Sequence, residues 1–256
     1  MNHIISTESI YNDQAENWLR SEKILLSDYT ARPIVLQELG SVTGQHLLDV
    51  GCGEGYVSRI ILDAGAASVF GVDSSSEMIS QAKSVAAELG LHKAIYEVSD
   101  AVTFNRYPRT QFDQVIAIFL FNYLTVKEMT QVMTNVKSLL SPNGIFIFTV
   151  PHPCLPFMRN QSPPFYFKFG DKNYFEGVDV TFEGRIWRRD GITVPVRCVH
   201  KTFTHYFEAL QSAGFKKMPS IRELAVTEEH LTLDPEFFGP LKGYPLHLLF
   251  KVQANG

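Results

Sequence analysis

The sequence predicts an α/β fold built on a doubly wound, mostly parallel, seven-stranded sheet. From residue 46 to residue 150, short apolar segments alternate with helical segments, a pattern typical of a parallel sheet with helices on both faces. The strands are apolar along their whole length, as expected of strands buried on both faces. A glycine-rich turn at residues 51–55 joins the first apolar segment to a helix. This geometry is typical of a site for a nucleotide-like cofactor.

The elements are expected in the following order. Two helices should lie within residues 7–40, with Pro33 in the first turn of the second. Five strands should follow at 46–50, 68–72, 94–98, 112–118 and 144–150, with helices at 55–64, 75–89 and 126–140 between them. Gly65 and Gly90 occupy C-cap positions, and Ser74 to Ser76 offer N-cap side chains. A helix at 205–213 and strands at 215–221 and 246–252 complete the prediction.

Length and composition favour one domain with an embellishment. The chain has 256 residues, of which 45% are hydrophobic and 20% charged, enough for one substantial core. We expect four parts: an N-terminal helical cap (1–45), a cofactor-binding core (46–150), a substrate lid insert (151–200) and the C-terminal part of the sheet (201–256).

Charge and composition disfavour several classes of partner. A net charge of −4 and a pI near 6.1 give no overall attraction to nucleic acid or to an anionic membrane. The three cysteines form no CxxC pair, which suits free thiols in a reducing compartment. The first residues contain no basic segment followed by a long apolar one. We expect a soluble cytoplasmic protein, monomer or homodimer, that acts on a small molecule, with no nucleic acid and no membrane as partner.

The glycine spacing indicates which cofactor is bound. Gly51, Gly53 and Gly55 stand at alternate positions, whereas a dinucleotide-binding turn needs its third glycine where this chain has Tyr56. A nicotinamide oxidoreductase is therefore disfavoured. A turn of this kind can still hold an adenosine that carries no phosphate.

The segment from Asp49 to Gly55, Asp-Val-Gly-Cys-Gly-Glu-Gly, resembles the first motif of the class I S-adenosylmethionine-dependent methyltransferases. The resemblance implies a Rossmann-like sheet whose last strand is inserted antiparallel. It also implies S-adenosyl-L-methionine as cofactor and S-adenosyl-L-homocysteine as product.

Acidic residues after the first three strands fit such a cofactor. Asp73 ends the second strand, where its carboxylate can accept hydrogen bonds from both ribose hydroxyls, although it could also cap the next helix. By the resemblance, Asp100 accepts a hydrogen bond from the adenine amino group, and Asp49 holds the glycine turn and the methionine amino group. A surface turn is the alternative for Asp100. Phe119, after the fourth strand, is a cofactor contact or an ordinary core residue.

Two N-terminal residues complete the cofactor set. The segment around Tyr11 resembles the part of small-molecule methyltransferases that closes over the methionine end, and Arg32 could pair with the cofactor carboxylate. Solvated helix positions are the alternative for both. The full set of expected cofactor contacts is Tyr11, Arg32, Asp49, Gly51, Cys52, Gly53, Gly55, Asp73, Ser74, Met78, Ser99, Asp100, Ala101 and Phe119.

The segment from 151 to 200 interrupts the alternation and should overhang the carboxyl edge of the sheet. Five prolines between 151 and 164 exclude a regular helix there, and aromatic runs follow. Arginines lie in the same insert, but a solvated hairpin turning at Asp190-Gly191 explains Arg188 and Arg189 equally well. The expected substrate-binding residues are Arg197, His205, Trp187 and Tyr29.

A general base is needed only if the acceptor must lose a proton. His152 lies between Pro151 and Pro153, directly after the fifth strand, and is the first candidate. His200 is the second, by resemblance to a histidine-containing stretch of the family. Both could instead be structural histidines. The histidines and cysteines lack tight ligand spacing, so no metal site is expected.

These observations predict methyl transfer to an O or C atom of a small, aromatic or lipophilic metabolite, with an acidic group as a further option. The chain has Phe119-Leu120-Phe121-Asn122 where methyltransferases of planar nitrogen atoms carry Asn/Asp-Pro-Pro-Tyr, which counts against DNA and protein glutamine as acceptors. The alternatives are a catalytically silent cofactor-binding or partner-activating protein, and an RNA or protein methyltransferase.

Overall fold

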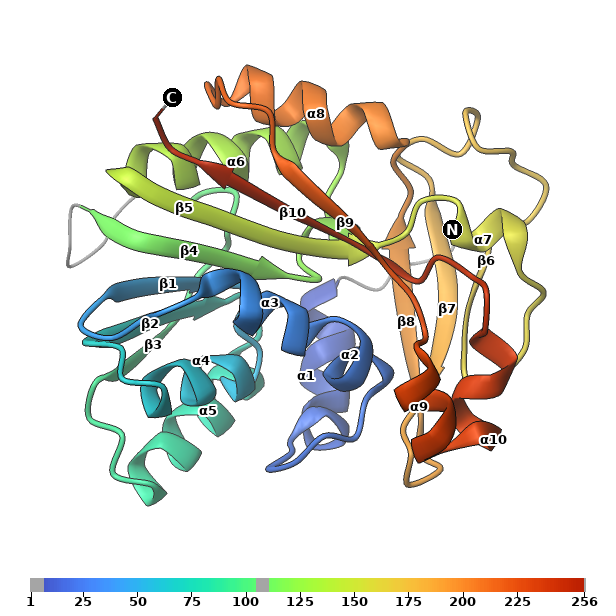
Figure 1. Cartoon of the computed structure of the whole chain (residues 1–256), viewed down its shortest axis with the longest axis horizontal. Helices are drawn as coiled ribbons and strands as arrows, with labels where there is room; N and C mark the ends of the chain where they lie inside the picture. Colours follow the sequence, from blue (N-terminus) through green and yellow to red (C-terminus); the bar gives the residue numbers. More distant parts are fainter. Residues whose placement is uncertain (1–6, 105–110, 256) are drawn as a thin grey trace.

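The computed structural model describes residues 7–104 and 111–255, and its centre is a seven-stranded sheet (Figure 1). The strand order is β3-β2-β1-β4-β5-β10-β9. The strands are β1 His46–Val50, β2 Ser68–Asp73, β3 Ala94–Val98, β4 Phe112–Ile118, β5 Leu140–Pro151, β9 Ser220–Leu224 and β10 His247–Gln253. The first five strands are parallel, and β10 is antiparallel to both of its neighbours. The predicted fold class is confirmed, including the antiparallel last strand.

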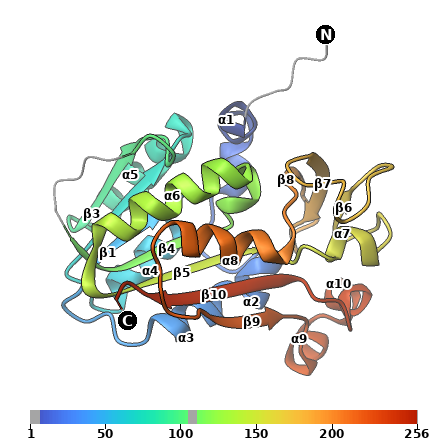
Figure 2. The ribbon, with the colours of Figure 1, turned by 90° about the horizontal axis from the view of Figure 1, so that it is seen from above.

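Helices cover both faces of the sheet. On one face lie α3 (Arg32–Leu39), α4 (Tyr56–Asp63) and α5 (Ser76–Glu88), and on the other α6 (Val126–Leu139) and α8 (Phe203–Ser212), as Figure 2 shows for α6 and α8. Leu47 belongs to the first face and Leu48 to the second, because successive side chains of a strand point to opposite faces. Every strand of the centre is therefore covered on both sides, which explains its continuous apolar sequence.

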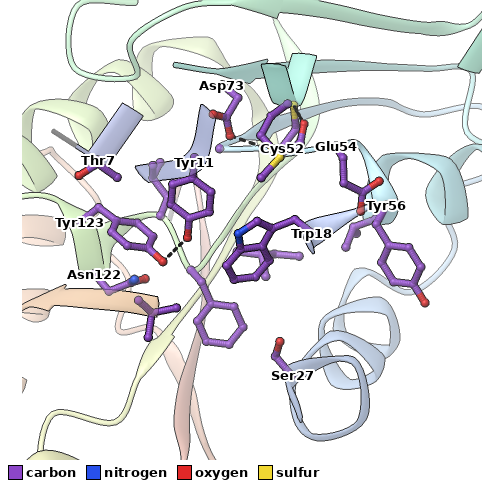
Figure 3. A pocket seen from close by; sticks show the side chains of 18 of the residues that line it. Thr7, Tyr11, Trp18, Ser27, Cys52, Glu54, Tyr56, Asp73, Asn122 and Tyr123 are labelled. Carbon is purple, nitrogen blue, oxygen red and sulfur yellow. Dashed lines mark hydrogen bonds between the residues drawn. The ribbon is translucent and has the colours of Figure 1, made fainter. Parts of the chain in front are cut away.

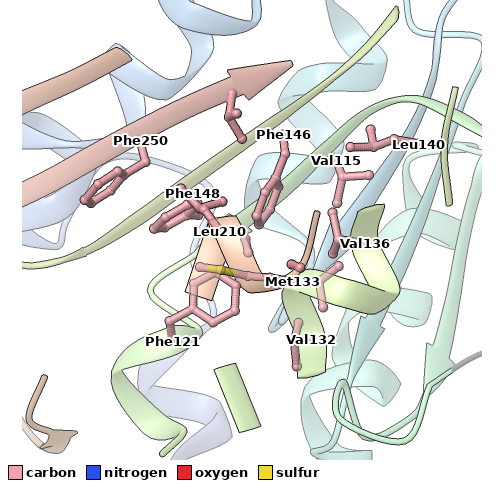
Figure 4. Packing of buried hydrophobic residues seen from close by; sticks show 14 of the residues in the cluster. Val115, Phe121, Val132, Met133, Val136, Leu140, Phe146, Phe148, Leu210 and Phe250 are labelled. Carbon is pink, nitrogen blue, oxygen red and sulfur yellow. The ribbon is translucent and has the colours of Figure 1, made fainter. Parts of the chain in front are cut away.

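Aromatic side chains fill the core beneath α6 and α8 (Figure 4). The rings of Phe148 on β5 and Phe250 on β10 stack with their centroids 4.7 Å apart, and Phe121 meets Phe148 edge-on at 5.1 Å. Such pairs stabilise a core by about 0.5–1.5 kcal/mol each beyond the burial of their area. The packing ties the end of β4 to β5 and β10, whose ends border the site described below.

Between residues 7 and 40 the chain forms three helices, whereas two were expected. They are α1 (Thr7–Trp18), α2 (Leu26–Thr30) and α3. Asp28 accepts hydrogen bonds from the amides of Ile24 and Leu25, which fixes the start of α2. The backbone breaks at Ala31 (φ −130°), and Pro33 lies in the first turn of α3 as expected.

The C-terminal region differs in detail from the expectation. The strand expected at 215–221 is β9, Ser220–Leu224, because Pro219 has no amide N–H for pairing and Phe215 is buried in the core instead. Short helices that the sequence pattern did not predict connect it to β10: α9 (Glu228–Leu233), α10 (Pro235–Phe238) and the 3₁₀ turn η2 (Gly239–Leu241).

The insert after β5 forms a second, antiparallel sheet of order β6-β7-β8. It contains α7 (Leu155–Met158), β6 (Phe165–Lys168), β7 (Thr181–Trp187) and β8 (Thr193–Val199). No helix was expected near α7, but this single turn accommodates Pro156 because a proline is tolerated in the first turn of a helix. A separate cluster that includes Phe182, Phe238 and Leu246 packs this sheet against α10 and the start of β10. In both Figure 1 and Figure 2, α1 lies between the β6-β7-β8 sheet and α5.

Candidate active site

The carboxyl ends of the parallel strands border a cavity (Figure 3). The loops after β1, β2, β3 and β4 line one side of it, and α1, α2 and the β6-β7-β8 sheet line the other. The cavity spans the junction of β1 and β4, where the strand order changes direction and where open α/β sheets bind ligands. Of the residues expected to contact the cofactor, those that line it are Tyr11, Arg32, Asp49, Gly51, Cys52, Gly53, Asp73, Ser74, Met78, Ser99, Asp100, Ala101 and Phe119.

The glycine turn has a backbone that side chains would disturb. Gly51, Gly53 and Gly55 have φ angles of 75°, 55° and 78°, a region that residues with a Cβ rarely adopt. Gly55 does not line the cavity. It precedes α4, and a Cβ at this position would lie 2.6 Å from the hydroxyl of Tyr96. Gly55 therefore lets β3 and the turn approach each other.

Asp73 joins the glycine turn to the start of α5. Its Oδ2 accepts the Gly53 amide at 2.9 Å and its Oδ1 accepts the Ser75 amide at 3.0 Å. Burial raises the pKa of Asp73, while these backbone donors lower it. Each carboxylate oxygen can accept a second hydrogen bond, so the group can still receive two hydroxyls of a ligand. The capping alternative and the binding role are compatible, because Ser75 itself caps α5 by accepting the Met78 amide.

Asp49 is a buried carboxyl at the end of β1. It is 2% exposed and accepts a hydrogen bond from Ser58 Oγ at 2.6 Å. Burial raises the pKa of Asp49 to about 7, with the Ser58 hydrogen bond acting in the opposite direction. A carboxyl held in this state can be stabilised as the anion by a ligand that brings a positive charge.

Helix α1 covers the cavity with two aromatic side chains that lie on the same face of the helix. Tyr11 and Trp18 lie seven positions apart on α1 and so share a face, with ring centroids 5.3 Å apart. The Tyr11 and Tyr123 hydroxyls form a short hydrogen bond, which ties α1 to the loop after β4 (Figure 3). Asn12 accepts a hydrogen bond from Ser75 at the start of α5. Tyr11 is therefore a cavity residue rather than a solvated helix position.

A buried ion-pair network supports the same end of the cavity. Asp28 pairs with Arg20 at 2.9 Å and with Arg32 at 3.0 Å, and Glu54 of the glycine turn pairs with Arg20 at 3.0 Å and Arg59 at 2.6 Å. Breaking a buried network of this kind by removing one partner is strongly destabilising, by about 3–5 kcal/mol. The network fixes α2 and α3 against the glycine turn and orients Arg32.

Four cavity residues carry buried polar atoms without a hydrogen-bond partner among the described residues. These atoms are Trp18 Nε1, Arg32 Nε, Asn122 Oδ1 and His247 Nδ1. An unpaired buried donor or acceptor costs about 1–3 kcal/mol, so such groups are normally satisfied. Their gathering around one cavity indicates a polar ligand that completes them.

The opposite side of the cavity is apolar. It is lined by Leu25, Leu26, Pro151, Phe165, Phe167, Ile186 and Val196. Phe165 and Phe167 alternate along β6 and so share one face of that strand. Phe119 lies at the boundary, with the unusual φ of 57° and with its ring 5.7 Å from the Arg32 guanidinium. The cavity therefore has a polar half at the strand ends and an apolar half beneath the insert.

Comparisons with known proteins agree with this geometry. Residues 47–144 match a family model described as a methyltransferase domain. This segment of the chain is a methyltransferase domain, and solved S-adenosylmethionine-dependent methyltransferases share its fold. The resemblance of the glycine turn is thereby confirmed, and S-adenosylmethionine is the cofactor of these proteins.

Two relatives illustrate the match at the level of sequence. An uncharacterized protein of Haemophilus influenzae is 30% identical over 137 residues, which cover 53% of each chain. A ubiquinone biosynthesis O-methyltransferase of Pasteurella multocida is 29% identical over 123 residues, 45% of this chain and 50% of that protein. The chain thus spans about half the length of these curated relatives.

Solved structures match over more of this chain but at lower identity. An S-adenosylmethionine-dependent methyltransferase from Mesorhizobium loti aligns with a TM-score of 0.65 and 22% identity, covering 86% of this chain and 96% of that one. The CcbJ methyltransferase of Streptomyces caelestis aligns with a TM-score of 0.66 and 17% identity, covering 97% and 98%. These alignments show a common fold.

Neither of the candidate bases, His152 and His200, lines the cavity. His152 is buried, with Nε2 3.0 Å from Glu223 and with Nδ1 accepting the Cys154 amide. His200 is buried against the ring of Phe182 and donates through Nε2 to the Tyr174 carbonyl. Burial lowers the pKa of each. The structural alternative describes both side chains.

The four residues expected to bind substrate also lie outside the cavity lining. His205 caps α8 through Thr202, the Trp187 ring lies beside Tyr166, and the Tyr29 hydroxyl donates to the Lys23 carbonyl. Arg197 donates to the hydroxyl of Thr7, a cavity residue at the start of α1, and so lies at the rim. These side chains contact neighbouring residues and do not line the cavity.

The predicted hairpin turn at Asp190-Gly191 is present, but the Arg188 side chain is only 10% exposed and also donates to the Asn17 carbonyl of α1, so it is not solvated. Arg188 pairs with Asp190 in the turn between β7 and β8, where Gly191 has a φ of 87°. Arg189 pairs with Asp234 at 3.0 Å. Within residues 7–104 and 111–255 there is no group of three or more His, Cys, Asp or Glu side chains suited to a metal ion. In the same ranges no helix is long and apolar enough to cross a membrane.

Several residues that line the cavity were not predicted from the sequence: Trp18, Arg20, Glu54, Asn122, Tyr123 and His247. A signal existed for Trp18, which follows Tyr11 at a spacing of seven on a helix. Tyr123 and Asn122 lie in the loop after β4 that was already considered for the cofactor. His247 had no local signal, because its neighbours in the sequence form an ordinary apolar strand.

Proposed function

We propose that the protein transfers the methyl group of S-adenosylmethionine to an oxygen or carbon atom of a small aromatic or lipophilic molecule. The observation that carries this proposal is the single cavity that joins a polar half at the strand ends to an apolar half beneath the insert. A ligand that extends across such a boundary would place its reactive group next to an apolar acceptor.

The polar half suits the cofactor. Asp73 would receive the ribose hydroxyls, and Asp100 with Ser99 and Ala101 would border the adenine. Asp49 would bind the methionine amino group, and the unpaired Nε of Arg32 would donate to the methionine carboxylate. These donors and acceptors match the chemistry of the cofactor, including the positive charge that a buried Asp49 calls for.

The apolar half suits the acceptor. Phe165, Phe167, Ile186 and Val196 come from the β6-β7-β8 sheet, so we propose that residues 151–200 act as the substrate lid. The O-methyltransferase named among the relatives supports an aromatic or lipophilic acceptor. An acidic acceptor would depend on Arg197, which lies at the rim and bonds to Thr7.

The covered cavity and the net charge of −4 favour a small molecule over nucleic acid. A monomer or homodimer in the cytoplasm remains our expectation for its assembly and location. The apolar half and the polar half form one cavity, which would let an acceptor reach the cofactor. This arrangement favours an enzyme over a catalytically silent protein.

The chemistry requires mainly positioning. The sulfonium of the bound cofactor supplies an activated methyl group for in-line displacement. The chain would contribute by holding the two molecules in line, which can account for about 7–11 kcal/mol of a barrier. Phe119, Pro151 and the aromatic residues of β6 would exclude water from the reacting atoms.

A calorimetric titration and a methyl-transfer assay together test the proposal. The protein should bind S-adenosylhomocysteine, and it should transfer tritium from methyl-labelled S-adenosylmethionine to acceptors in a panel of phenols and lipophilic hydroxyl compounds. Binding of NAD without binding of S-adenosylhomocysteine would contradict the cofactor. Binding of S-adenosylhomocysteine without turnover of any compound in a metabolite extract would support the catalytically silent alternative.

A further inference from the structure

His247 is a cavity residue that the roles above do not use. It is the first residue of β10 and pairs with Pro151 at the end of β5, so it lies at the carboxyl edge of the sheet. Its side chain is 3% exposed, and its ring centroid is 4.9 Å from that of Phe119 and 6.0 Å from that of Phe165. The ring thus stands where the polar and apolar halves of the cavity meet.

Hydrogen bonds fix which nitrogen of this ring carries the proton. The Thr30 hydroxyl donates its single proton to the Leu26 carbonyl at 3.0 Å. The oxygen of Thr30 can therefore only accept from His247 Nε2, which lies 3.1 Å away. Nε2 carries the proton, and Nδ1 is left with a lone pair. Nδ1 is one of the buried cavity atoms without a partner among the described residues.

The surroundings keep the ring neutral. Burial, together with the nearby Arg32 of α3 and His152 after β5, lowers the pKa of His247 to about 3. The ring is therefore an acceptor at Nδ1 throughout the physiological range. A buried acceptor of this kind needs a donor, and a ligand atom that brings a hydrogen can supply it.

We propose that His247 Nδ1 accepts a hydrogen bond from a neutral hydroxyl group of the acceptor molecule and thereby holds its oxygen for methylation. This inference rests on the proposed function and narrows it to an oxygen atom that bears a proton. A carboxylate or phenolate oxygen would face the Nδ1 lone pair and be disfavoured. The His247 ring recognises the acceptor hydroxyl, and Thr30 positions the ring through its hydrogen bond with Nε2.

The proton balance of the step is simple. The acceptor oxygen forms its bond to the methyl carbon as the carbon–sulfur bond breaks, and the positive charge leaves the sulfur. The hydroxyl proton passes to Nδ1 as the oxygen becomes an ether oxygen, and it is released to water when the product leaves. The low basicity of the ring favours this release.

Nuclear magnetic resonance of ¹⁵N-histidine-labelled protein saturated with S-adenosylhomocysteine tests the tautomer directly. His247 should show an unprotonated Nδ1 and a protonated Nε2, both unchanged between about pH 6 and about pH 8. Phenol should shift the Nδ1 resonance, whereas anisole, which has the same ring but no hydroxyl proton, should not. A protonated Nδ1, an equal response to both compounds, or no response to phenol overturns the proposal.

Two substitutions separate the two ring nitrogens. His247→Gln can still donate to Thr30 but lacks an acceptor at the Nδ1 position, so phenol should bind about fivefold to tenfold more weakly while anisole binding is unchanged. His247→Asn keeps an amide oxygen near the Nδ1 position and should retain more of the phenol affinity. Equal losses for phenol and anisole overturn the proposal.

Controls distinguish this inference from the proposed function. His92→Gln is the matched control, because His92 is exposed in the loop before β3 and lies outside the cavity lining. Each variant should bind S-adenosylhomocysteine within about twofold of the unmodified protein. If the unmodified protein fails to bind S-adenosylhomocysteine, the proposed function fails. If it binds but Nδ1 does not respond to phenol, only the role of His247 fails.

Discussion

The two halves of the cavity are built in different ways. The polar half uses residues in short contiguous segments at the ends of parallel strands, such as 51–54 and 73–74. The apolar half collects residues from α2, β5, β6, β7, β8 and the first position of β10. The first half depends on local backbone conformation, and the second depends on how distant elements pack. This difference explains why the cofactor could be predicted with much more detail than the acceptor.

The largest expected effect is on the local backbone of the polar half. Gly55→Ala should destabilise the protein by about 3 kcal/mol or more, because a Cβ at a φ of 78° would also lie 2.6 Å from the Tyr96 hydroxyl. Gly90→Ala is the matched control: its φ is 66°, but a Cβ there would meet nothing within 4 Å. It should cost about 1–2 kcal/mol. Equal losses in denaturant unfolding would contradict the role of Tyr96.

The next effect is on cofactor binding. Asp73→Ala should weaken the affinity for S-adenosylhomocysteine by about 1–3 kcal/mol, the scale of losing hydrogen bonds to a charged group. Calorimetry at constant pH measures it. Glu77→Ala, an exposed carboxylate in the first turn of α5 that does not line the cavity, provides the control. An affinity unchanged by Asp73→Ala would remove this residue from the site.

A pH dependence should report on Asp49. Its pKa is raised to about 7, so in the free protein the carboxyl is mostly protonated below that pH. If the anion binds the cofactor ammonium, the dissociation constant of S-adenosylhomocysteine should fall by about eightfold from pH 6 to pH 7.5. Asp49→Asn should abolish this slope. The same slope in the variant would assign it to another group.

The pH dependence that Asp49 gives to folding stability has the opposite sign to the one it gives to cofactor binding. Between the ordinary pKa of 3.8 and the raised value of about 7, the folded protein binds the Asp49 proton more tightly than the unfolded chain does. The contribution of this group to stability is therefore greatest at low pH and falls as the pH rises to about 7. Bound S-adenosylhomocysteine should reduce that fall, as thermal unfolding with and without the ligand would show.

The smallest effect is expected for His152. Both ring nitrogens are engaged outside the cavity, so His152→Gln should change kcat by less than about twofold and leave cofactor affinity unchanged. This outcome would separate it from His247, whose ring borders the cavity. A large loss of kcat in soluble, folded His152→Gln would restore it as a candidate base.

Most of the fold could be predicted because each element has a local cause. The alternation of apolar strands with capped helices located β1 to β5 and their helices within a few residues. The errors occurred where tertiary contacts override the pattern. Pairing with β10 and the burial of Phe215 decide where β9 begins, and the side chain of Asp28 divides the N-terminal region into three helices.

The candidate site was predictable to a different extent in each half. Thirteen of the expected cofactor residues line the cavity, whereas His152, His200, Arg197, His205, Trp187 and Tyr29 do not. Polar and aromatic residues of the insert were judged by composition. Composition cannot distinguish a side chain that faces the cavity from one that pairs with its neighbour, as Arg188 does with Asp190.

The sequence by itself determined the α/β sheet, the glycine turn and the carboxylate that follows β2. These depend on residues close together in the chain, where φ angles, caps and strand ends follow from residue type. Only the tertiary structure decided which side chains converge on the acceptor. His247 shows the physical reason: its tautomer depends on a hydroxyl of α2, and its position depends on pairing with Pro151, contacts that no local pattern encodes.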